Sequence, residues 1–220
     1  MERIVLLRAT PKAVTAETAQ WFVEHGDTVY LGGTALSEYP DGVLPLEFDP
    51  FAPQSLEKAV KQLEDRHGRL DILILGTIGD AGDGEIGSGH SDEMMLDTLM
   101  NDTYGNLQIA EAFEPLLKNG LKRIAGITDV ESSNTNCTGA ANIGASAAAA
   151  AFNMMGRILY NHLRPEGFTF RWYCDDGKMG GMCAGEYIAS ALCYDPKEPY
   201  THSDENRMVL RDAYLRELSW

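Results

Sequence analysis

The sequence predicts an α/β protein in which one parallel sheet lies between two layers of helices, in a single domain over residues 1–220. Short apolar runs at Arg3–Leu7 (RIVLL) and Leu70–Leu75 (LDILIL) indicate buried strands. They alternate with stretches of helical spacing at Thr15–Glu24 and Pro53–His67, and this alternation is typical of βαβ units. We therefore expect a doubly wound, three-layer α/β/α fold with about seven strands.

Further elements follow in the same alternation. Gly26 and Gly68 are expected to end the first two helices, and Ser55 is a candidate N-cap of the second. The remaining strands are expected at Thr28–Leu31, Leu46–Phe48, Arg123–Thr128 and Phe168–Cys174, and the remaining helices at Ser91–Leu117, Asn142–Leu163 and Glu186–Cys193. The glycine-rich stretches Gly76–Gly89 and Asp175–Gly185 are expected to be loops. The first of them lies at the carboxyl end of the preceding strand, where ligands bind in such sheets.

Composition excludes several classes of function. The net charge is −15, so the surface repels phosphate backbones and anionic lipid, and neither nucleic acid nor membrane is an expected partner. No segment approaches the roughly 20 apolar residues of a membrane span, and the start, MERIVLL, is too short for a signal peptide. The four cysteines form no CxxC pair, which favours reduced thiols in a cytoplasmic protein and no metal site.

Several phrases occur in an order that is familiar from one family. These are HGRLDILILG at His67–Gly76, EAFEPLLKNGLKRIAGIT at Glu111–Thr128, IGASAAAAAFNMMGRILYNHLRPEGFTFR at Ile143–Arg171, and the closing RDAYLRELSW. With them the chain resembles the short-chain dehydrogenases/reductases over almost its whole length. The resemblance implies a Rossmann-type sheet, an NAD(P) cofactor and hydride transfer assisted by a serine, a tyrosine and a lysine.

The cofactor motif of that family is missing. Its Thr-Gly-x-x-x-Gly-x-Gly turn falls on Arg8–Thr15, where every glycine is replaced and Pro11 has no N–H to offer a phosphate. Arg8 and Lys12 could still attract an anion. Asp49 matches the family's adenine-contacting aspartate, although an aspartate before a helix is common for capping alone. We expect no cofactor, and NAD(P) only if the activity implied by the resemblance is retained.

The catalytic motif is missing as well. The serine position falls on Asp129, or on Thr128 if the loop shifts by one residue, the tyrosine position on Ile143, and the lysine position on Ala147. Isoleucine cannot transfer a proton, and alanine cannot lower the pKa of a neighbour. No catalytic residue is therefore assigned.

Other residues could supply chemistry in this region. Asp102, at the position of the family's helix asparagine, could meet Tyr104 and Asp129 at the carboxyl ends of the strands and form an acid/base pocket. Two such aspartates are more often helix caps or solvated loop residues. His90 is a candidate loop base, although a surface histidine at such a position is more common.

The sequence leaves three functions open. The first is a non-catalytic pseudo-enzyme that acts as a structural or regulatory subunit. Its long helices Ser91–Leu117 and Ala140–Leu163 would pair in a helix bundle, as in the family, either with a second copy or with an active relative. The second is a divergent NAD(P)-dependent oxidoreductase with a non-standard site, and the third is a sensor of a small molecule.

Overall fold

The computed structural model describes residues 2–34, 38–79, 87, 89, 91–176, 180–190, 192–194 and 201–220, with the backbone alone at 180–183, 192–194, 201 and 202. The strands are β1 (Ile4–Arg8), β2 (Thr28–Gly33), β3 (Leu44–Glu47), β4 (Ile72–Gly76), β5 (Arg123–Asp129), β6 (Thr169–Asp175), β7 (Leu192–Tyr194), β8 (Thr201–Ser203), β9 (Leu210–Arg211) and β10 (Glu217–Leu218). The helices are α1 (Ala13–Glu24), α2 (Pro53–His67), α3 (Asp92–Leu99), the π-helix η1 (Met100–Gly105), α4 (Asn106–Lys118), the 3₁₀ turns η2 (Val130–Ser132) and η3 (Arg164–Glu166), α5 (Ile143–Leu163) and α6 (Gly180–Ala189).

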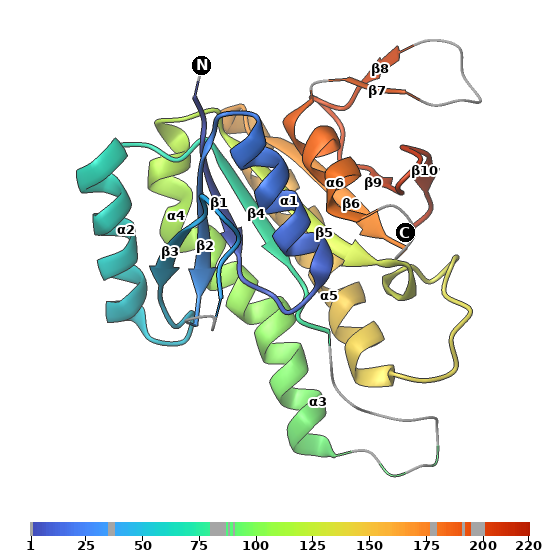
Figure 1. The fold of residues 1–220 in the computed structure, drawn as a ribbon. Helices are drawn as coiled ribbons and strands as arrows, with labels where there is room; N and C mark the ends of the chain where they lie inside the picture. Colours follow the sequence, from blue (N-terminus) through green and yellow to red (C-terminus); the bar gives the residue numbers. More distant parts are fainter. Residues whose placement is uncertain are drawn as a thin grey trace.

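Eight strands form one sheet in the order β10-β9-β6-β5-β4-β1-β2-β3 (Figure 1). From β3 to β9 each strand runs parallel to its neighbours, while β10 runs antiparallel to β9. The chain winds outward in both directions from β1 and β4, which confirms the predicted doubly wound sheet. The short strands β7 to β10, two of them in a separate hairpin, were not predicted from the sequence.

Helices cover both faces of this sheet. Alternate residues of each strand point to opposite faces, so Ile4 and Leu6 of β1 pack with α2, α4 and α5. Val5 and Leu7 of the same strand pack with α1 and α6 on the other face (Figure 1). Each face of the sheet therefore has its own hydrophobic core. The near-continuous apolar runs predicted as strands are explained by burial on both faces.

The predicted helix Ser91–Leu117 exists, but it is not one regular α-helix. Ser91 caps α3 by accepting the N–H of Met94 at 3.3 Å, and the π-helix η1 then joins α3 to α4. A π-helix widens the turn and rotates the residues that follow it. Asp102 and Asn106 are both fully buried along this stretch, at the side facing the sheet. Pro115, predicted to help end the helix, lies inside α4, which ends at Lys118.

Two predictions about helix ends were wrong. The stretch predicted as the loop Asp175–Gly185 becomes helical at Gly180, and the helix ends at Ala189 rather than at Cys193. A Cβ at Gly185 would lie 2.7 Å from the Trp21 ring, so this glycine permits α6 to pack on α1 and does not mark a turn. Ser55 is not an N-cap, because α2 begins at Pro53, where a missing N–H costs nothing.

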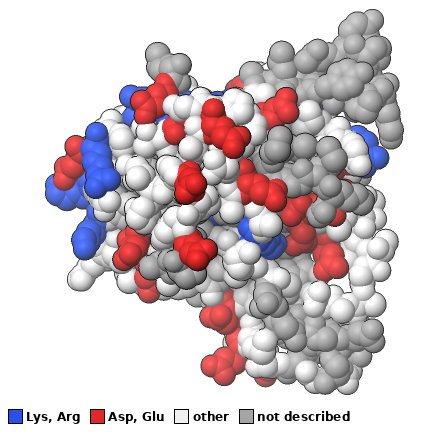
Figure 2. Space-filling model, in the orientation of Figure 1, with Lys and Arg blue, Asp and Glu red and all other residues white. Residues whose placement is uncertain are grey.

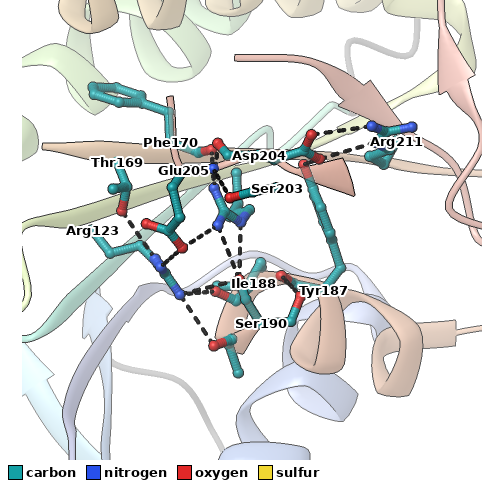
Figure 3. A network of polar contacts seen from close by, with 12 residues as sticks. Arg123, Thr169, Phe170, Tyr187, Ile188, Ser190, Ser203, Asp204, Glu205 and Arg211 are labelled. Atoms are coloured by element: carbon teal, nitrogen blue, oxygen red, sulfur yellow. Dashed lines mark hydrogen bonds and ion pairs between the residues drawn. The ribbon is translucent and has the colours of Figure 1, made fainter. Parts of the chain in front are cut away.

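A network of buried and partly buried ion pairs joins α6 and the C-terminal segment to the sheet (Figure 3). Arg171 of β6 and Arg123 of β5 both bond Glu205, and both donate to the carbonyl of Ser190 after the end of α6. Asp204 accepts two bonds from Arg211 of β9, each at 3.1 Å. Cations near the last turn of α6 also suit the negative end of its dipole. The segment between β6 and β9 is thus held at its C-terminal end.

The surface carries the expected acidic charge. Figure 2 shows acidic side chains spread over the visible face, with one group of basic side chains at its left edge over α2 and others near its centre and right edge. In the part of the chain that the structure describes, no helix has the length and apolar character needed to cross a membrane. Two of the cysteines predicted as reduced, Cys137 and Cys174, are free thiols, and burial raises the pKa of Cys174 to about 12.

Candidate functional site

The carboxyl ends of β1, β4 and β5 meet at one edge of the sheet, and the side chain of Lys12 crosses this edge. Lys12 ends the turn after β1 and precedes the first residue of α1. Its Nζ donates to the Thr77 hydroxyl at 2.8 Å, just beyond β4, and to Asp129 Oδ2 at 3.3 Å, at the end of β5. The lysine therefore links three strand ends that lie far apart in the sequence.

The turn from Ala9 to Lys12 is packed with side chains. The hydroxyls of Thr10 and Thr15 are hydrogen-bonded to each other, and both residues are buried. A Cβ at Gly76, opposite this turn, would lie 3.3 Å from Thr10 Cγ2. The space in which a glycine-rich turn would expose backbone N–H groups to a phosphate is therefore occupied by methyl and hydroxyl groups.

Asp102 is fully buried beside the same edge and holds the chain that follows β4. Its two carboxylate oxygens accept the backbone N–H groups of Ile78 at 2.7 Å and Gly79 at 3.2 Å. Burial raises the pKa of Asp102, while these two bonds and the charges of Arg8 and Lys12 oppose that rise. Both oxygens are engaged in structure, which leaves the carboxyl group poorly placed to exchange a proton with a substrate.

Asn106 supports the same segment, and the sequence analysis missed it. Its Nδ2 donates to the carbonyls of Gly76 at 3.0 Å and Asp102 at 2.7 Å. Three buried oxygens at this edge have no hydrogen-bond partner among the described residues, namely Asn106 Oδ1, Thr128 Oγ1 and Asp129 Oδ1. The only signal in the sequence was the spacing of Asn106 four positions after Asp102, which brings two residues to one side of a helix.

The other candidates of the acid/base pocket lie elsewhere. Tyr104 is exposed, stacks on Phe51 and lines a groove on the outside of η1 with Leu99, Met100 and Leu107. The structure thus places Lys12 near Asp102 and Asp129 but does not bring the Tyr104 ring to them. His90 lies outside the described residues.

Ile143 and Ala147 face a separate cavity. Together with Glu131, Cys137 and Ser146 they line a space of about 450 Å³ between α5 and the loop before it. Ser146 donates to Glu131 Oε2 at 3.3 Å across it. Neither Ile143 nor Ala147 offers a group that exchanges a proton, so the positions corresponding to the tyrosine and lysine of the resembling family present only hydrocarbon to this cavity.

Arg8 and Asp49 differ in their relation to the sheet edge. Arg8, at the end of β1, is 5% exposed and lines a pocket of about 210 Å³ together with Phe48, Ile78 and Ile109. Asp49 is exposed, and its Oδ1 accepts the N–H of Phe51 at 2.8 Å in a local turn before α2. The described lining of the pocket includes residues on either side of Asp49 but not Asp49 itself.

In the ranges that the structure describes, no group of three or more histidine, cysteine, aspartate or glutamate side chains is arranged to hold an ion.

Comparison with known proteins identifies the fold. No protein-family model and no curated protein matches the sequence. Among solved structures, the carbonyl reductase Sniffer of D. melanogaster matches with a TM-score of 0.79 over 100% of both chains at 15% identity. A short-chain dehydrogenase from Burkholderia cenocepacia J2315 in complex with NADP has a TM-score of 0.66, covering 82% of this chain and 75% of that chain at 19% identity.

A third similar structure is the NADH-dependent reductase A1-R′ complexed with NAD, with a TM-score of 0.65, covering 80% of this chain and 78% of that chain at 12% identity. The doubly wound parallel sheet with helices on both faces thus defines an α/β protein. More particularly, the chain has the fold of the short-chain dehydrogenases/reductases, as the resemblance in the sequence implied.

The residues at the sheet edge do not fit a dinucleotide. Lys12 and Thr10 fill the turn where a pyrophosphate would approach the backbone. The pocket beside Arg8 measures about 210 Å³, below the roughly 300–1,000 Å³ of typical ligand and cofactor sites.

Proposed function

We propose that this protein is a non-catalytic member of the short-chain dehydrogenase/reductase fold that serves as a structural or regulatory subunit. The observation that carries the proposal is the position of Lys12. Its ammonium is bonded to Thr77 and Asp129 at the carboxyl ends of the strands, the place that the cofactor takes in the resembling family. The hydrocarbon side chains of Ile143 and Ala147 support it independently, because hydride transfer would lack its proton donor even if a cofactor entered.

The first test is titration of the purified chain with NADH and NADPH by calorimetry. We expect no saturable binding in the micromolar range, and no oxidoreductase turnover of aldehydes or ketones. The double variant Ile143→Tyr with Ala147→Lys should also remain inactive, because the turn at Arg8–Thr15 still excludes the pyrophosphate.

An active short-chain dehydrogenase measured in parallel shows that the assay detects binding and turnover. Micromolar binding of either dinucleotide to the wild-type chain would contradict the proposal and favour the divergent oxidoreductase. Turnover in the double variant would show that the turn accepts the cofactor.

The subunit role rests on an exposed apolar surface, here named the helix surface and defined by Leu96, Leu99, Met100, Met154 and Ile158. The first three lie on α3 and η1, and the last two on the exposed side of α5. These helices pack against each other, with Thr103 donating to the carbonyl of Ala148 at 3.4 Å. A groove of about 420 Å³ with an almost wholly apolar lining opens along η1.

Exposed apolar side chains on neighbouring helices favour association. We infer that the helix surface pairs with a second copy of the chain about a twofold axis, the default geometry for such contacts. Pairing with an active relative would use the same helices and is the second arrangement. The cytoplasmic location stays a prediction from the sequence.

The second test measures association with the variant Ile158→Glu, whose wild-type side chain is 61% exposed. Light scattering should give a dimer for the wild-type chain and a monomer for the variant, since a carboxylate buried at an interface without a partner is strongly disfavoured. Lys61→Gln, an exposed substitution on α2 and outside both helices predicted to pair, is the matched control and should stay dimeric.

A monomeric wild-type chain that forms a complex with an active relative, lost on Ile158→Glu, would replace the homodimer by the heteromer. A wild-type chain that associates equally with and without the substitution would overturn the role of the helix surface.

A further inference from the structure

A buried arginine with unused donors lines the small pocket at the carboxyl end of β1. Arg8 donates one bond, from Nη1 to the carbonyl of Asn101 at 2.6 Å. Within the described part of the chain it has no other hydrogen-bond acceptor and no direct ion pair. A guanidinium has five N–H donors in a fixed fork. Most of the Arg8 donors therefore have no acceptor among the described residues, although the residue is only 5% exposed.

The nearest carboxylate does not satisfy this arginine. Asp102 acts on Arg8 through charge, but its two oxygens accept the N–H groups of Ile78 and Gly79. Loss of hydration on burial lowers the pKa of Arg8 to about 10, so the side chain still carries its charge at neutral pH. A buried cation that lacks a bonded anion is costly, and an anion entering the pocket would offset that cost.

Much of the described lining of this pocket is apolar. Phe48, Pro50, Ile78 and Ile109 contribute hydrocarbon, and Thr34 stands at the exposed end of the lining. The volume of about 210 Å³ corresponds to about seven waters at roughly 30 Å³ each. A compact apolar body of a single ring or a short branched chain fits this space, and a dinucleotide does not.

The charge count selects a monoanion. Arg8 is the single cation in the described lining of the pocket. Lys12 is not part of that lining, and its ammonium is bonded to Asp129. The charge of Asp102 beside it would further disfavour a dianion such as phosphate. The arginine fork matches the two oxygens of a carboxylate, which it binds with two parallel bonds.

We propose that this pocket is a binding site for a small monocarboxylate with an apolar body. Arg8 binds the carboxylate of the ligand, and the side of the pocket at Phe48 contacts the hydrocarbon of the ligand. The site does not depend on the helix surface or on a cofactor. It gives the chain a ligand that could be sensed at the sheet edge.

The test uses benzoate as the probe, with ligand-observed NMR and calorimetry on the full chain. Benzoate is expected to bind with a dissociation constant of about 1 mM or tighter. Benzamide, which has the same shape without the charge, should bind about 10- to 100-fold more weakly, because a charge-assisted hydrogen bond is lost. Inorganic phosphate should bind more weakly than benzoate for want of the apolar contact.

Two variants locate the site. Arg8→Gln removes the cation and should weaken benzoate about 10- to 100-fold. Thr34→Trp fills the exposed end of the pocket, leaves the buried arginine in place, and should abolish binding even if Arg8→Gln proves unfolded. Arg157→Gln is the matched control, because Arg157 lines a different pocket beside Trp220 and its loss should leave benzoate unaffected.

Equal binding of benzoate and benzamide, equal binding of phosphate, or unchanged binding in Thr34→Trp would each overturn the proposal. So would the absence of any benzoate signal with the wild-type chain. Binding of NADH would contradict the non-catalytic function instead, so the two proposals fail on different readouts.

Discussion

Replacing Asp204 with alanine is expected to lower the free energy of unfolding by about 3–5 kcal/mol, because one partner of a buried charge pair is removed. The side chains of Asp204 and Arg211 are 1% and 2% exposed, and two bonds of 3.1 Å join them. The Tyr187 hydroxyl donates to the same carboxylate at 3.3 Å (Figure 3). Without Asp204, the guanidinium of Arg211 stays buried and loses this carboxylate, while the exposed Glu217 lies 3.8 Å away.

The matched control acts on the same arginine from the surface. Glu217→Gln removes a carboxylate that is 46% exposed, and the change in unfolding free energy is expected to be below about 1 kcal/mol. Urea denaturation followed by circular dichroism measures both variants. The double variant Asp204→Ala with Arg211→Met should recover part of the loss, since no unpaired buried charge remains. Equal effects of Asp204→Ala and Glu217→Gln would contradict the account of this pair.

Replacing Trp172 with alanine should cost about 3–5 kcal/mol of unfolding free energy, the range for truncating a buried aromatic residue. Trp172 of β6 is fully buried, stacks on Phe152 with ring centroids 5.1 Å apart, and donates from Nε1 to Asn153 Oδ1 at 2.9 Å. Cβ atoms placed at Gly126 and Gly156 would each lie 2.4 Å from the indole ring. These two glycines make the room in which the tryptophan joins α5 to the sheet.

Met154→Ala is the control for this prediction. It shortens an apolar side chain on the same helix that is 62% exposed, and it should change the unfolding free energy by less than about 0.5 kcal/mol. Circular dichroism in guanidinium chloride reports both changes without depending on tryptophan fluorescence. Because Trp172 positions α5, the Trp172→Ala variant should also weaken association through the helix surface. If Trp172→Ala lowers the unfolding free energy by less than Met154→Ala does, α5 docks on the sheet without the tryptophan.

Much of the fold follows from the sequence because its signals are local. The apolar run at Leu70–Leu75 and the β-rich stretch Phe168–Cys174 predicted strands to within about two residues at either end, since burial on both faces favours apolar, aromatic and β-branched residues. Helix α2 was predicted with its observed limits, Pro53 and His67, because Pro at the first position and Gly after the last are strong boundary signals. The missing glycines and the residues at 143 and 147 could likewise be identified without coordinates.

The contacts that form the site could not be predicted from such local signals in the sequence. Nothing in the sequence near Lys12 shows that its ammonium reaches Thr77 and Asp129, 65 and 117 positions away. The roles of Asn106, of Gly185 against Trp21, and of Asp204 against Arg211 depend equally on residues brought together by the sheet.

The sequence alone therefore determined the α/β class and the order of the main strands, because residue type and short-range spacing carry that information. The loss of the cofactor and catalytic motifs stays a prediction from the resemblance. The tertiary structure alone decided that the Lys12 ammonium is bonded to Thr77 and Asp129, whereas Arg8 lines a pocket and, among the described residues, donates a single hydrogen bond, to the carbonyl of Asn101. The physical reason is that a charged side chain takes its role from the partners and the burial around it, and both are set by contacts between distant parts of the chain.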